Sequence, residues 1–502
     1  MKLQHITKIA LLIGGGLLFN FLFWDEILGV NLLLFSVFLV ALGFITQRDL
    51  ILSKGGWIAT AGLMLTGVMV ILHHSLAARI VHIISLIVFI GFLCEPTLKA
   101  IYHAIVAAIA NALSLPGSIL RELFQNHENY GKLRKRWRWA KLIIIPILAF
   151  WIFYAIFYAS NPVFSEYSDS FWNSIGEVLA DIFKDISILW ILQLIFGIAL
   201  VGLILFRSTR SGVTDYEKGL NDDIKRQKKH RTLLLSFRKI TLVSLKNEYK
   251  SALVLVGSIN ALLLLVNAID IYWIWFNFEY DGTANLSQLV HEGTYLLILS
   301  ILLSMGILLY FFRRNLNFLP NNVWLRRLAN VWIIQNTVLV ISVIIRNYHY
   351  MYHFGLAYKR IGVVFFLTAV IIGLITLFFK INKAKTTFYL LRVNSWGVYC
   401  LLLILSSVNW DIVIVKHNIQ YTHEKNLDAK FLLYLSEKTL PIIDQNREKF
   451  NSGHGSYAPQ IFERILDRKI QHFIEDAEKR SWKSWNYADA KALDYFTSSN
   501  KQ

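Results

Sequence analysis

The stretch "IGVVFFLTAVIIGLITLFF", residues 361–379, decides the fold class of this chain. It carries no charged residue, and it is as long as a helix that crosses the hydrocarbon core of a bilayer, about 20 residues. Inside that core the backbone must satisfy its own polar groups, which a single continuous apolar run does as an α-helix. The stretch therefore predicts a membrane-spanning helix.

Similar apolar runs recur along the 502 residues, of which 55% are hydrophobic and 17% charged. We predict about eleven spans, near residues 8–23, 27–45, 57–73, 78–95, 139–158, 187–206, 251–273, 289–311, 326–345, 361–379 and 394–412. The predicted fold class is thus an all-α, polytopic transmembrane helix bundle over residues 1–415, with its first helix retained. A shorter alanine-rich run, 100–115, ends at Pro116-Gly117 and predicts an interfacial or re-entrant helix.

The net charge of +18 has two interpretations, nucleic-acid binding and loop orientation in a membrane. Lysine and arginine outside the tail gather in alternate loops, above all 96–138 and 207–250, as they do in cytoplasmic loops. We therefore predict a cytoplasmic N-terminus, an extracytoplasmic C-terminus and no nucleic-acid partner. The basic stretches "KLRKRWRWAK" (132–141) and "KRQKKHR" (225–231) are expected to contact anionic lipid head groups.

The tail, residues 416–502, is polar and has a helical pattern. Its apolar residues recur at helical spacing and predict one buried helix face, made of Ile461, Phe462, Ile465, Leu466, Phe473 and Ile474. We expect a small α-helical extracytoplasmic domain that is able to bind a protein partner.

Polar residues near the predicted outer ends of several spans form the candidate binding site. Charged groups at membrane depth are costly, so they pair with one another or line a pathway. The site residues predicted on this ground are Asp270, Glu292, Arg346, Arg360, Asp411, Asn267, His291 and Tyr352. The alternative is a set of ion pairs that only holds the bundle together. The tyrosines between residues 346 and 360 are also typical of an aromatic belt at head-group depth.

Known chemical motifs give no support for an enzyme. His349 and His353 are four residues apart, but two imidazoles without an acidic partner do not make a metal site, so no metal is predicted. The chain has no nucleotide phosphate loop, no nucleophile elbow and no kinase signature. We predict no cofactor and leave the question of an enzyme open, leaning to none.

Several motifs carry a family resemblance, namely "NEYKSALVLVGSINALLLLVNAID" (247–270), "VHEGTYLLI" (290–298), "RNYHYMYHFGLAYKR" (346–360) and "NWDIVIVKHNI" (409–419). Together they resemble the bacterial membrane family called domain of unknown function 4173 and its relative 4153, over about residues 140–441. The family's glycine-leucine-threonine turn is here Gly355-Leu356-Ala357. The resemblance implies a multi-pass protein of the bacterial inner membrane and brings no established activity.

The predicted function is a non-enzymatic transport, channel or lipid-handling role that uses the outward-facing polar cluster. Two alternatives remain open at this stage. One is a membrane transferase that acts on a lipid-linked substrate, and the other is an envelope sensor or assembly scaffold.

Overall fold

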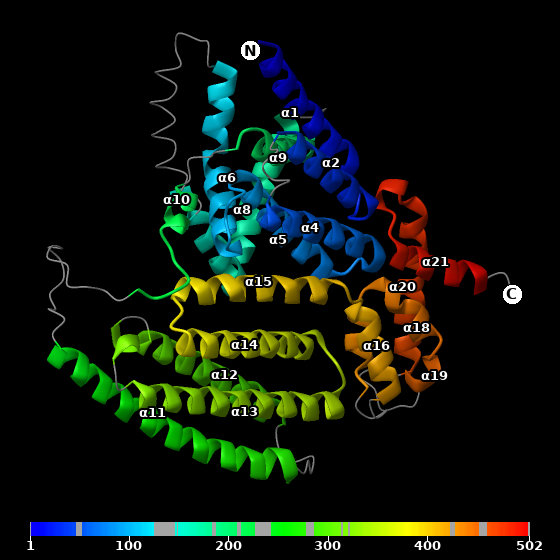
Figure 1. The fold of residues 1–502 in the computed structure, drawn as a ribbon. Coiled ribbons are helices and arrows are strands. Elements are labelled where there is room, and N and C mark those ends of the chain that lie inside the picture. Colours follow the sequence, from blue (N-terminus) through cyan, green and yellow to red (C-terminus); the bar gives the residue numbers. More distant parts are fainter. Residues whose placement is uncertain are drawn as a thin grey trace.

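The computed structural model describes residues 2–46, 53–124, 146–147, 149–182, 187–207, 212–225, 242–277, 286–312, 315–319, 322–421, 427–450 and 459–499. Within these ranges every regular element is a helix, which confirms the all-α fold class (Figure 1). The basic stretches 132–141 and 226–231 lie outside the described residues. Their predicted contacts with lipid therefore stay predictions.

In the described part of the chain, 9 helices are long and apolar enough to cross a membrane. They lie in α1 (Lys2–Phe23), α4 (Lys54–His73), α5 (Leu76–Cys94), α6 (Ile101–Phe124), α9 (Ile188–Leu205), α11 (Leu242–Asp270) with its π-helical continuation η1 (Ile271–Phe276), α13 (Val323–Phe354), α14 (Tyr358–Asn382) and α15 (Thr387–Ser406). Shorter apolar helices are α2 (Val30–Thr46), Ala149–Ser160 and the Leu296–Phe311 part of α12 (Leu286–Phe311). The polytopic bundle is confirmed.

The spanning helices form two bundles that meet at α15 (Figure 1). One apolar core joins α1, α2, α4, α5, α6 and α9, and a second joins α11 to α14. Helix α15 contributes Tyr399 to the first core and Leu390 to the second. The Tyr399 hydroxyl donates to Ser85 Oγ of α5 at 3.1 Å. A single helix therefore packs into both bundles.

Helix α6 continues through Pro116 to Phe124 rather than ending at Pro116-Gly117. Its start lies against α10 (Val213–Lys218), where Ala100 N donates to Glu217 Oε1 at 3.1 Å. Its last turn meets the start of α1, where Lys8 Nζ is 3.7 Å from Glu122 Oε1. Both ends of α6 thus lie at the end of the bundle where α1 begins, and Figure 1 shows α6 running across the direction of α15. Its predicted placement, interfacial or re-entrant, stays a prediction.

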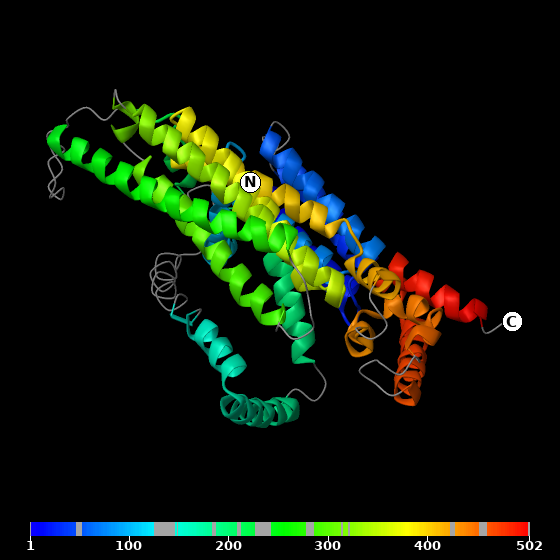
Figure 2. The same ribbon diagram turned by 90° about the horizontal axis from the view of Figure 1, so that it is seen from below.

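The C-terminal helices pack together at one end of the bundles in both views (Figures 1 and 2). They are α16 (Trp410–Tyr421), α17 (Ala429–Tyr434), η4 (Glu437–Thr439), α18 (Leu440–Asp444), α19 (Arg447–Phe450), α20 (Pro459–Lys479), η5 (Trp482–Ser484) and α21 (Tyr487–Ser499). The remaining described elements are α8 (Pro162–Ile182) and η2 (Asn315–Phe318).

The predicted apolar face of the tail lies on α20. Phe462, Leu466 and Phe473 are buried in a third apolar core, whereas Ile461 is 42% exposed at the edge of that face. This core also takes in Ile361 from the start of α14 and residues of α16. The tail therefore shares its core with the ends of the spanning helices, and the predicted boundary at residue 415 falls inside α16.

Candidate functional site at the seam of helices α11 and α13

Helices α11 and α13 run parallel and in register. Asn260 Nδ2 donates to the carbonyl oxygen of Leu328 at 3.1 Å, and Asn267 Nδ2 donates to that of Gln335 at 3.0 Å. Both hydrogen bonds join residues that are 68 positions apart, so one step along α11 corresponds to one step along α13. We call this helix contact, with the side chains named below, the seam.

The α11 side of the seam repeats at spacings of four or three residues, the pattern by which two helices bury a common stripe. Its buried positions are Ala252, Val256, Asn260, Leu263, Asn267, Asp270 and Ile274. Two amides and one carboxylate thus interrupt an otherwise aliphatic stripe. Asn267 and Asp270 of this stripe were predicted as site residues from the sequence, and the structure adds the partner helix.

Asp270 and Arg346 form an ion pair at the C-terminal end of the seam. Arg346 Nη2 lies 2.6 Å from Asp270 Oδ1, and Asp270 is only 6% exposed. The helix changes from α to π directly after Asp270, and within this π-helix Trp275 Nε1 donates to Ser342 Oγ at 3.0 Å. Short π-helical segments are frequent at functional sites.

Several buried acceptor oxygens along the seam meet no donor among the described residues. A backbone carbonyl can only accept, so the amide nitrogen of Asn260 must face Leu328 and its oxygen must face away. The same holds for Asn267 against Gln335. The oxygens left without a donor are Asn260 Oδ1, Asn267 Oδ1, Asp270 Oδ2 and Gln335 Oε1. Such groups are costly in a membrane unless something donates to them.

Arg360, a second predicted site residue, has a different environment. Its guanidinium lies over the ring of Tyr350, 4.1 Å from the centroid, and donates to the carbonyl oxygens of Phe354, at 2.8 Å, and Gly355. These carbonyls end α13, so Arg360 closes the C-terminus of that helix, where a cation is favourable. Tyr352 is 64% exposed on the same helix.

The other predicted residues divide between two places. His291 and Glu292 belong to α12, and their side chains lie outside the described part of the structure. Asp411 lies in α16 and contacts the tail instead of the seam: Lys438 Nζ is 2.6 Å from its Oδ2, and the Tyr358 hydroxyl donates to its Oδ1. The structure thus brings together Asn267, Asp270 and Arg346 and places Asp411 in a separate network.

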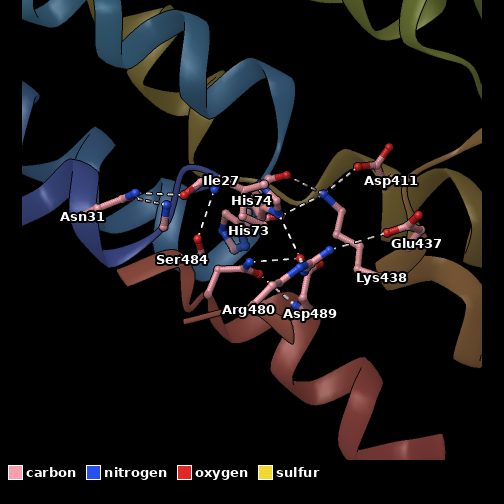
Figure 3. A network of polar contacts seen from close by, with 12 residues as sticks. Ile27, Asn31, His73, His74, Asp411, Glu437, Lys438, Arg480, Ser484 and Asp489 are labelled. Atoms are coloured by element: carbon pink, nitrogen blue, oxygen red, sulfur yellow. Dashed lines mark hydrogen bonds and ion pairs between the residues drawn. The ribbon is translucent and has the colours of Figure 1, made fainter. Parts of the chain in front are cut away.

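That network fastens the tail to both bundles (Figure 3). Lys438 Nζ also donates to the carbonyl oxygens of His73, at 2.8 Å, and His74, at 3.2 Å, in the turn between α4 and α5. Burial lowers the pKa of the Lys438 ammonium, and the Asp411 carboxylate counteracts part of that lowering. One lysine of the tail thus contacts the first bundle at His73 and the end of the second through Asp411.

His74 adds a second contact from the same turn. It has a left-handed backbone, with φ of 44°, and its Nδ1 lies 3.1 Å from Asp489 Oδ2 of α21. Arg480 Nη1 approaches the same carboxylate oxygen at 2.6 Å. Burial would raise the pKa of Asp489, but the hydrogen bonds from His74 and Asn486 and the charge of Arg480 hold it well below its usual range.

The turn between α1 and α2 is held by the same end of the tail. Glu26 Oε1 accepts from Ser481 Oγ at 2.6 Å and lies 2.9 Å from Lys483 Nζ, and Ser484 Oγ donates to Glu26 Oε2. Burial would raise the pKa of Glu26, but these hydrogen bonds and the Lys483 charge bring it below its usual value. The partners in this network, above all Lys438, Asp489 and Lys483, were not identified from the sequence.

Long apolar helices in two bundles, with a buried ion pair between parallel helices, define a multi-pass helical membrane protein. Within this class, the chain belongs to the family described as "Domain of unknown function (DUF4153)", whose model matches residues 34–446. The sequence motifs resemble two related families, 4173 and 4153, and the matching model is that of 4153. No curated protein and no solved structure matches the chain.

Proposed function

We propose that this protein carries a small ion or polar solute across the bacterial inner membrane without covalent chemistry, and that Asp270 and Arg346 are its working pair. The observation that carries the proposal is the buried 2.6 Å contact between these residues on parallel spanning helices. In the proposed orientation the N-terminus is cytoplasmic and the tail extracytoplasmic. The pair then lies toward the outer face, and solutes reach it from outside.

The energetics of the pair favour a working role over a purely structural one. Taking two charges out of water is costly, and apolar side chains of similar size usually hold helices together equally well. A pair selected only for stability would also satisfy its remaining polar atoms, yet Asp270 Oδ2 and Arg346 Nε are buried without a partner among the described residues. Ionisable residues that are kept in a spanning segment despite this cost typically mark ion or substrate pathways.

The test compares single substitutions with an exchange of the two charges. Asp270→Asn and Arg346→Gln each leave one charge uncompensated, so both should impair complementation of a deletion strain. The double variant Asp270→Arg with Arg346→Asp restores the attraction but moves the carboxylate to the other helix. If the pair works in transport, the exchange should recover membrane abundance and melting temperature while complementation stays lost.

Two results would contradict this proposal. Full complementation by both single variants would remove the pair from any working role. Recovery of both abundance and complementation by the charge exchange would show that only the attraction matters, as expected for a structural ion pair. Arg360→Gln serves as a comparison, because this arginine closes a helix and has no carboxylate partner among the described residues.

A further inference from the structure

The buried oxygens of the seam define the chemistry of what passes along it. We propose that water molecules line up between α11 and α13, that protons move along this file, and that the Asp270 carboxylate is the group that binds them. The inference rests on the proposed transport function and names its substrate class.

The spacing of the oxygens suits a file of water rather than one bound metal ion. Asn260, Asn267 and Asp270 share one face of α11, and ten residues of helix extend about 15 Å, half of a hydrocarbon core of about 30 Å. A metal ion needs all of its oxygen ligands within about 2.6 Å of itself. Oxygens one and two helical turns apart can instead each accept a hydrogen bond from a different water.

Both donors and acceptors are found among the buried atoms without a partner, which also favours water over a metal ion. Besides the acceptor oxygens, Trp332 Nε1 and Arg346 Nε are buried donors without an acceptor among the described residues. Water can donate to the first set and accept from the second, whereas a metal ion can satisfy only oxygens. The guanidinium of Arg346, 2.6 Å from Asp270, also repels any further fixed positive charge at that carboxylate.

A proton can nevertheless be accepted, because it neutralises the carboxylate instead of adding a separate ion. An excess proton leaves the last water of the file and bonds to a carboxylate oxygen of Asp270, which becomes a neutral carboxylic acid. Arg346 then loses its counter-charge and is free to move away. When the proton leaves Asp270 for water on the other side, the carboxylate and its contact with Arg346 are restored. No electrons are exchanged in either step.

The test uses the full-length protein in liposomes that contain a pH-sensitive dye, with an imposed pH gradient and the membrane potential clamped by potassium and valinomycin. Wild type should carry protons. Asp270→Asn and Asn267→Leu should lower the flux by at least about tenfold, a change that corresponds to about 1.4 kcal/mol in a barrier. Ser258→Leu is the matched control, because Ser258 is on α11 but donates only to its own helix and is exposed. It should leave the flux unchanged.

A conservative variant separates loss of the path from loss of the fold. Asn267→Ser makes room for water and keeps a polar group, so it should retain flux where leucine at the same position abolishes it. The proposal is overturned if wild type carries no protons, or if Asn267→Leu folds and conducts like wild type. Another outcome is that the charge variants of Asp270 and Arg346 fail to complement while Asn267→Leu carries protons at the wild-type rate. In that case the proposed transport role of the pair is retained and the proton path along the seam is rejected.

Discussion

Lys438 is a lysine in an environment where an ammonium group is costly, since its side chain is only 1% exposed. Its charge is balanced by Asp411 and by two backbone carbonyls of the turn between α4 and α5. Lys438→Met removes that balance and leaves the carboxylate of Asp411 buried and uncompensated. We expect a loss of about 3–5 kcal/mol in the free energy of unfolding, the usual cost of breaking a buried pair.

The melting temperature in detergent measures this loss, and Lys430→Met is the matched control. Lys430 is exposed on α17, so its replacement removes the same charge with little effect. Asp411→Asn added to Lys438→Met should recover part of the stability, because no buried charge then remains. Equal melting temperatures for wild type and Lys438→Met would refute the role given to this lysine.

Single residues show what the sequence can and cannot reveal about the site. Asn267 and Asp270 are found from sequence alone, because polar side chains on one face of an apolar helix are conspicuous. Arg346 was predicted for the same site, but its pairing with Asp270 and the contact of Asn267 with Gln335 were not, since helical periodicity fixes the face of a helix but not which helix covers it. Lys438 is hidden in "SEKT", a polar stretch in a polar tail that resembles any solvated turn. Its burial depends on packing against a turn more than 360 positions earlier.

Helices α5 and α6 approach each other closely at Gly91. A Cβ atom at this position would overlap the backbone carbonyl of Ala104 in α6, which cannot move aside as a flexible side chain can. We expect Gly91→Ala to force the two helices apart at a cost of about 1–3 kcal/mol, as overpacking does in a well-packed core. Thermal unfolding of the purified protein measures the effect.

Gly257 of α11 provides the opposite case, because nothing lies within 4 Å of a Cβ atom there. Alanine at that position should keep or raise the stability, by up to about 1 kcal/mol, since glycine is a poor residue for a helix interior. If both alanine variants melt alike, the close contact between α5 and α6 does not limit stability.

The length of an apolar run in the sequence predicted well where the helices lie. The residues around such a run predicted poorly where each helix begins and ends. Most predicted spans correspond to helices, but the last one is displaced: α15 ends at Ser406, and Trp410 begins a separate helix, α16. The run at 100–115 extends to Phe124. Proline usually ends a helix, yet Pro116 is accommodated within α6. Neither outcome is decided by local composition, because both depend on neighbouring helices.

The proposed orientation of the whole molecule can be checked with reporter fusions. The loop after Phe206 belongs to the most basic part of the chain, so a reporter fused there should be active in the cytoplasm. A reporter fused after Asn418 should be active outside the cytoplasm. Activity of both reporters in one compartment would rule out this orientation, whatever the function of the seam.

The arrangement of the whole chain was the least predictable feature. The helical class and the multi-pass character follow from composition, because the bilayer permits few alternatives. The division into two bundles, joined by α15 and fastened by the tail, does not. It depends on contacts such as Tyr399 with Ser85, 314 positions apart, and no periodicity in a single sequence encodes such a pair.

The contact between the two ends of the chain also fixes an order of events during biosynthesis. Ser484 donates to Glu26 across 458 positions, so the partners of this early carboxylate emerge from the ribosome only when translation is nearly complete. Until then Glu26 and Asp411 have no lysine from the tail beside them. A chain that stops before residue 438 therefore lacks both lysines and leaves two acids uncompensated, which distinguishes it chemically from the finished protein.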